Sequence, residues 1–120
     1  MYKYYNNNPL NNHIDDCTIR AISLLENKSW NETYDELSRL ANCDALMMDS
    51  VVFIEKYLDE RYPRICYNSK TVEEFVNEHK NGKYAITMVG HITPLIDGTI
   101  YDTFNPTLHN RLMRCAWKIE

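Results

Sequence analysis

The sequence predicts an α+β fold in which N-terminal helices pack on a C-terminal antiparallel β-sheet. Between residues 15 and 80, apolar side chains recur mainly at the spacing of amphipathic helices. From Lys83 onward, apolar segments of strand length follow one another, and Asp97-Gly98 between two of them is a strong signal for a two-residue hairpin turn. A chain of 120 residues with 44% hydrophobic residues is expected to form a single domain, residues 1–120.

Residues 1–12 are polar and rich in asparagine, and they are predicted to form an extended N-terminal arm rather than a regular element. Asp15 or Asp16 is expected to cap a first helix that ends near Asn27. Cys17 falls in the first turn of this helix. Its thiol is therefore expected at the positive end of the helix dipole.

Two capping boxes mark further helices. Ser29-Trp30-Asn31-Glu32 predicts the start of a long second helix, and Thr71-Val72-Glu73-Glu74 predicts a short fourth helix that stops before Gly82. Between them, Asp49 is expected to cap a third helix that is ended by Pro63.

The remaining apolar segments favour strands, because they are short and rich in β-branched and aromatic residues. The predicted strands are residues 64–67, 84–89, 92–96, 99–104 and 112–119. Most of the sheet is therefore expected in the C-terminal part of the chain, which is typical of an α+β protein.

The hairpin turn determines which side chains face one another. If the Asp97-Gly98 pair forms the loop, His91 and Asp102 are diagonal neighbours on one face, close enough for a side-chain hydrogen bond. Asn105 then points to the other face. This register favours Asp102 over Asn105 as the group that orients His91, although a bulge near Pro94 would reverse the assignment.

Charge and composition exclude several function classes. The formal net charge is −4 and the basic residues are scattered, so nucleic acid is not an expected partner. No apolar run approaches the ~20 residues of a membrane span. The N-terminus lacks the apolar stretch of a signal peptide. We expect a cytoplasmic protein, in the host cytoplasm if the chain is phage-encoded.

The four cysteines include no Cys-x-x-Cys pair. Reduced thiols are therefore expected, with Cys43, Cys66 and Cys115 in structural roles. His13 lies four residues before Cys17, but no further ligands stand at metal-site spacing. Neither a metal nor an organic cofactor is expected.

Cys17, His91 and Asp102 together suggest thiol-based acyl transfer. A cysteine alone is more often a small buried residue than a nucleophile, and only the pairing with the histidine and carboxylate favours a site. A thiol pKa of about 8.5 leaves the group mostly protonated at neutral pH, so His91 must shift it toward the thiolate. The side-chain amide of Asn11 or Asn12, with the backbone N–H of Cys17, would stabilise a developing oxyanion.

The segments that carry this chemistry resemble a known family. They are Asp16-Cys17-Thr18-Ile19-Arg20-Ala21-Ile22 near the start, and Gly90-His91 and Asp97-Gly98-Thr99-Ile100-Tyr101-Asp102-Thr103-Phe104 late in the chain. Their order resembles the papain-like cysteine peptidase superfamily, and more closely the small phage and bacterial papain-like proteins. The resemblance covers both ends of the chain, whereas the middle matches only as helices.

By this resemblance the fold would be papain-like and the protein a cysteine hydrolase. Cys17 would be the nucleophile, His91 the general base and acid, and Asp102 the orienting carboxylate. Asn11 or Asn12 would stand where the superfamily places an oxyanion-hole amide. Family members cleave peptide or isopeptide bonds, and some relatives transfer acyl groups.

The leading hypothesis is a hydrolase that cleaves a peptide, isopeptide or other amide bond in a protein or peptide substrate. Two alternatives stay open. One is a catalytically inactive binding module on the same fold, for instance a phage protein that sequesters a host factor. The other is a thiol acyltransferase, which would pass the acyl group to an amine instead of water. The sequence indicates neither the substrate nor the oligomeric state.

Overall fold

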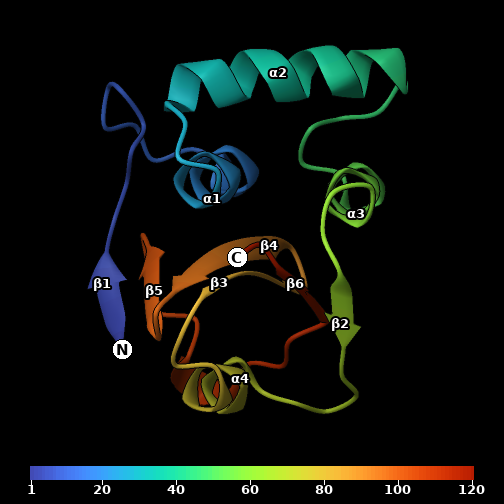
Figure 1. Cartoon of the computed structure of the whole chain (residues 1–120). Coiled ribbons are helices and arrows are strands. Elements are labelled where there is room, and N and C mark those ends of the chain that lie inside the picture. The colour runs from blue at the N-terminus through green and yellow to red at the C-terminus, as the bar shows by residue number, and fades with distance from the viewer.

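The computed structural model describes all 120 residues and confirms the α+β class, with four α-helices and one six-stranded sheet. The helices are α1 (Cys17–Leu25), α2 (Trp30–Cys43), α3 (Val51–Asp59) and α4 (Val72–Glu78), with a 3₁₀-helix η1 (Leu108–Asn110). The strands are β1 (Tyr2–Tyr4), β2 (Arg64–Cys66), β3 (Lys83–Met88), β4 (His91–Ile96), β5 (Thr99–Asp102) and β6 (Cys115–Lys118). They lie in the order β1-β5-β4-β3-β6-β2, with α1, α2 and α3 on one face of the sheet and α4 on the other (Figure 1).

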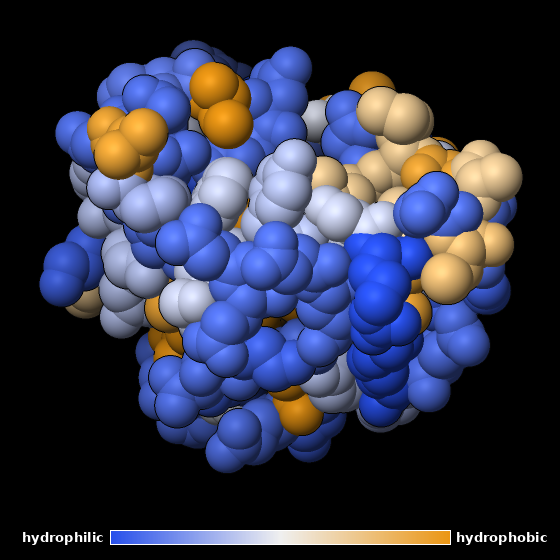
Figure 2. Space-filling model, turned by 90° about the horizontal axis from the view of Figure 1, so that it is seen from above, coloured by the Kyte–Doolittle hydropathy of each residue, from blue (hydrophilic) through white to orange (hydrophobic).

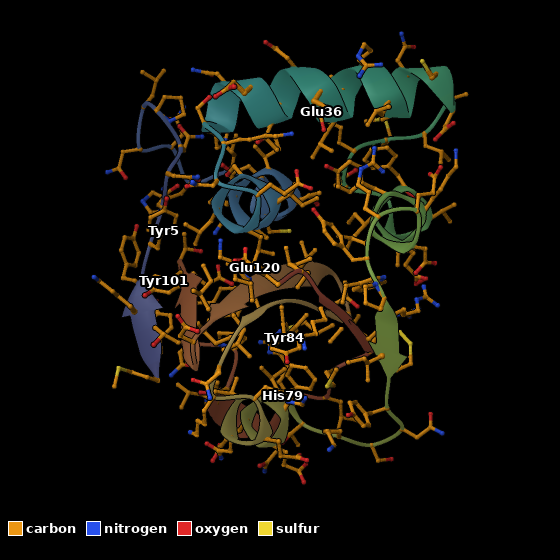
Figure 3. All side chains as sticks on the ribbon, viewed as in Figure 1. Tyr5, Glu36, His79, Tyr84, Tyr101 and Glu120 are labelled. Carbon is orange, nitrogen blue, oxygen red and sulfur yellow. A yellow bond between two sulfur atoms is a disulfide. The ribbon has the colours of Figure 1, made fainter.

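The N-terminal segment differs from the prediction of an arm without regular structure. Tyr2–Tyr4 forms β1, which pairs in parallel with β5, so the sheet is mixed rather than antiparallel. The Tyr2 hydroxyl donates to the carbonyl oxygen of Asp102, 100 residues away, at 3.0 Å. Next to β1, the rings of Tyr5 and Tyr101 meet edge to face (Figure 3). Partners this distant leave no local pattern in the sequence, which is why the strand was not predicted.

The predicted hairpin register is confirmed. The two turn residues, Asp97 and Gly98, have positive φ angles of 48° and 80°, as a two-residue hairpin loop requires. Ile96 pairs with Thr99 in the first step of the ladder between β4 and β5. The next pair of this ladder is Leu95 with Ile100. On its other side β4 pairs with β3 along its whole length, through Pro94, without a bulge in that ladder.

Alternate residues of β3 face two separate cores. Ala85 belongs to a cluster of 14 buried residues that joins α1, α2 and α3 to the sheet, and Trp117 of β6 lies in the same cluster. Tyr84 faces the opposite core, where it packs with Phe75 of α4. The His79 ring stacks on Phe75 and meets Tyr84 at a centroid distance of 4.9 Å (Figure 3). Because successive side chains of a strand point to opposite faces of the sheet, β3 contributes to both cores.

The helix starts follow local signals. Capping boxes begin α2 at Ser29 and α4 at Thr71, as predicted. The N-cap of α3 is Ser50 rather than Asp49, one residue later than predicted. Asp16 holds the N-cap position of α1, but its side chain makes no capping hydrogen bond. That carboxylate has other partners in the candidate site.

A disulfide joins Cys66 of β2 to Cys115 of β6. The two strands are antiparallel neighbours and place these residues directly opposite each other. The expectation of reduced thiols is therefore wrong for this pair. The two cysteines are 49 residues apart, so no local pattern in the sequence indicates that they meet. Cys17 and Cys43 are free.

Polar side chains dominate the outer face of α2 (Figure 2). Apolar side chains gather at the right of this view, over the C-terminal end of α2 and the segment that leads to α3, where Met47 is 72% exposed. None of the helices has the length and apolar character that a membrane span requires.

Candidate active site

The fold brings together three of the residues that the sequence singled out. Cys17 is the first residue of α1, His91 is the first residue of β4, and Asp102 is the last residue of β5. Helix α1 packs on β4, and the hairpin places β5 beside β4. One helix start and two strand ends therefore supply a thiol, an imidazole and a carboxylate to the same place.

Asp102 accepts four hydrogen bonds although it is only 1% exposed. Its Oδ2 accepts from His91 Nε2 at 2.6 Å and from Thr93 Oγ1 at 2.6 Å. Its Oδ1 accepts from Arg20 Nη1 at 3.0 Å and from the Thr103 backbone N–H at 2.7 Å. Burial acts to raise the pKa of Asp102, but the hydrogen bonds and the charge of His91 outweigh it, and the pKa lies below its ordinary value. The carboxylate is therefore ionised.

His91 lies between Asp102 and Cys17. Because Nε2 contacts the carboxylate, Nδ1 is the ring nitrogen left for the thiol. Burial acts to lower the pKa of His91, but the hydrogen bonds with Asp102 and Cys17 and their negative charges raise it to about 9. The ring also packs against Phe104 at a centroid distance of 4.7 Å, which restricts its orientation.

The Cys17 thiol is half-buried, and its pKa is lowered. Burial acts to raise this pKa, but the hydrogen bond and charge of His91, the backbone of Ile92 and the charge of Arg20 together outweigh it. A lowered thiol pKa beside an imidazole pKa of about 9 favours a thiolate–imidazolium pair at neutral pH. This is the ionisation state of an activated cysteine nucleophile.

Arg20 connects the helix to the hairpin. Its side chain is buried, with Nε 2.8 Å from Asp16 Oδ1 and Nη1 3.0 Å from Asp102 Oδ1. Asp16 in turn accepts from Trp30 Nε1 at 2.9 Å and from Asn8 Nδ2 at 3.3 Å. Burial acts to lower the pKa of Arg20, but both carboxylates raise it. Arg20 is not among the site residues that the sequence predicted, although its i, i+4 spacing from Asp16 is a signal for the first of these two ion pairs.

Asn11 and Asn12 are exposed, and neither lines the cleft above Cys17. The buried asparagine of this segment is Asn8, whose Oδ1 accepts from the backbone N–H groups of Leu10 and Asn12. The structure thus does not bring the predicted oxyanion amides to the thiol. Because the Asp16 side chain does not cap α1, the backbone N–H groups of its first turn remain as donors beside Cys17.

Asn105, the alternative partner of His91, lies elsewhere. Its Oδ1 accepts from the backbone and the hydroxyl of Thr107 in a local turn. The contact between His91 and Asp102 is the one that the hairpin register predicted.

A cleft of about 590 Å³ lies over the thiol and the imidazole, within the range of ligand sites in proteins. Its exposed apolar rim includes Ile14, Val51, Val89 and Phe104. Comparison with protein-family models, curated proteins and solved structures finds no match. The functional interpretation therefore depends on the geometry of the residues in this cleft.

Proposed function

We propose that this protein is a papain-like cysteine hydrolase that cleaves a peptide, isopeptide or other amide bond with Cys17, His91 and Asp102. The contact between His91 Nε2 and Asp102 Oδ2 at 2.6 Å is the observation that carries the proposal. It fixes the imidazole with Nδ1 free for the thiol. The lowered pKa of Cys17 and the raised pKa of His91 support the same assignment.

In the first half of the reaction, the Cys17 thiolate adds to the carbonyl carbon of the substrate. The oxygen becomes an oxyanion, for which the uncapped backbone N–H groups at the start of α1 are the proposed donors. The oxyanion then collapses, the C–N bond breaks, and His91 gives its Nδ1 proton to the leaving nitrogen. A thioester of Cys17 and a neutral imidazole remain.

In the second half, the neutral imidazole takes a proton from a water molecule as its oxygen adds to the thioester carbonyl. The C–S bond breaks and the acid product leaves, which restores the thiolate and the imidazolium. Asp102 keeps the ring oriented and stabilises its positive charge, but does not itself take the proton.

Alkylation by iodoacetamide tests the nucleophile. The rate at each cysteine is measured by peptide mass spectrometry from pH 5 to 9, for the wild type and for His91→Ala. Cys17 is expected to react much faster than Cys43 near pH 6 and to lose this advantage without His91. Equal rates at Cys17 and Cys43, or no effect of His91→Ala, would leave an inactive binding module as the better interpretation.

Turnover separates hydrolysis from acyl transfer. Cleavage of a peptide library by the wild type, with Cys17→Ala as the control, is expected to release carboxylic acid products. Acyl products that form only when an amine is added would instead identify an acyltransferase.

A further inference from the structure

A second, smaller cavity adjoins the cleft. Its volume is about 170 Å³, below the range of sites that hold a whole ligand, so it fits one side chain. It is lined by Asp15, Asp16, Thr18, Ile19, Met47, Met48 and Asp49. Asp15 and Asp49 line both spaces, and a substrate held over Cys17 can therefore extend a side chain between them.

The carboxylates at this junction have no cationic partner. Neither Asp15 nor Asp49 takes part in any salt bridge of the chain, and both are exposed. Asp16 differs, because Arg20, Trp30 and Asn8 already occupy its two oxygens. The cavity thus has two free negative charges at its entrance and a third that is neutralised within the protein.

Thr18 also lines the cavity, and its hydroxyl has no hydrogen-bond partner although the residue is only 3% exposed. A buried hydroxyl without a partner is uncommon in a folded protein. Two carboxylates and one hydroxyl oxygen match the three N–H donors of an ammonium group. Ile19, Met47 and Met48 supply apolar walls for the methylene chain that carries such a group.

A metal ion does not fit this site. No group of three or more His, Cys, Asp or Glu side chains is placed to hold one. Hard divalent cations require about six oxygen ligands. An organic cation needs fewer acceptors and fills the apolar part as well.

We infer that the small cavity is a subsite for a cationic side chain of the substrate, with lysine preferred because of its three donors. The inference rests on the proposed hydrolase function and assigns it a substrate class: peptides or proteins with a lysine near the scissile bond. Asp15 and Asp49 determine the specificity, and neither takes part in the bond-breaking steps.

Two chloromethyl ketones that alkylate Cys17 test the subsite, one built on Nα-acetyl-lysine and one on Nα-acetyl-norleucine, which lacks only the ammonium group. The lysine reagent is expected to label Cys17 about tenfold faster, the effect of charged hydrogen bonds in a partly enclosed site. The Asp15→Asn and Asp49→Asn double variant is expected to lose most of this preference. Asp35→Asn, which changes an exposed carboxylate of α2 outside both cavities, is expected to retain it.

The outcomes separate the two proposals. Equal rates for the two reagents at a reactive Cys17, or a preference that survives the double variant, would overturn the subsite and leave the hydrolase proposal intact. If neither reagent labels Cys17 faster than Cys43, the hydrolase proposal fails. The subsite is then tested in Cys17→Ala by NMR titration with the methylamides of Nα-acetyl-lysine and Nα-acetyl-norleucine. Shifts at Thr18 and Asp49 with the lysine compound alone support it, and any other pattern overturns it.

Discussion

The His91 imidazole lies between a buried carboxylate and a thiol, and this placement sets the pH range in which the ion pair exists. The proposed hydrolysis needs a thiolate and an imidazolium together. Its rate is therefore expected to rise as Cys17 loses its proton, at a pH below the ordinary thiol range, and to fall as His91 loses its proton near pH 9. A pH profile of kcat/KM measures both limbs. In His91→Ala the rate is expected to drop by about 10²–10⁴-fold.

Substitution of Asp102 tests the origin of the raised histidine pKa. Asp102→Asn retains the shape but removes the charge that stabilises the imidazolium, so the pKa of His91 is expected to fall from about 9. NMR titration of the His91 ring measures this shift directly. Asn105→Ala is the matched control, because the side chain of Asn105 forms hydrogen bonds only within its own turn. A larger effect of Asn105→Ala than of Asp102→Asn would contradict the assignment.

At the scale of elements, Arg20 is the contact that holds α1 against the end of β5. Arg20→Met would remove the guanidinium that the buried carboxylates of Asp16 and Asp102 share, and would leave Asp16 without a cationic partner. The free energy of unfolding is expected to fall by about 3–5 kcal/mol, the cost of breaking a buried ion pair from one side. Urea denaturation measures the change. Arg39→Met, at an exposed position of α2, is the control and is expected to change stability by less than about 0.5 kcal/mol.

The Arg20 bridge also has a functional readout. Without the cation, Asp102 loses a donor and its fixed position, so the acid limb of Cys17 alkylation is expected to move to higher pH in Arg20→Met. Arg20→Lys keeps the charge but cannot contact both carboxylates in the same planar geometry. We expect the alkylation profile of Arg20→Lys to shift less than that of Arg20→Met. A wild-type alkylation profile in Arg20→Met would limit Arg20 to a structural role.

At the scale of the whole molecule, the disulfide ties an edge strand of the sheet to its interior. Cys66 and Cys115 close a loop across 49 residues, for which the loss of chain entropy in the unfolded state corresponds to about 4 kcal/mol. Cys66→Ser is expected to lower the free energy of unfolding by up to this amount. Cys43→Ser, at a free exposed cysteine, is the control. An unchanged stability in Cys66→Ser would show that the bond does not stabilise the fold by restricting the unfolded chain.

The features that the sequence predicted are those with local signals. Capping boxes at Ser29 and Thr71 located two helices, and the Asp97-Gly98 turn fixed the register that pairs His91 with Asp102. The features that it missed depend on partners far along the chain. These are the parallel pairing of β1, the disulfide, and the contact of Arg20 with Asp102 across 82 residues.

The separation of the thiol from its imidazole along the chain has a consequence for synthesis. Cys17 belongs to the first helix and His91 to a strand that follows all four helices. During translation the chain emerges from its N-terminus, so the thiol is exposed well before its partner is made. Until then it has only the local helix and should titrate as an ordinary cysteine. A ribosome-bound chain that ends before β4 therefore lacks the imidazole that lowers the pKa of Cys17. In such a nascent chain the Cys17 thiol should be no more reactive than an ordinary cysteine.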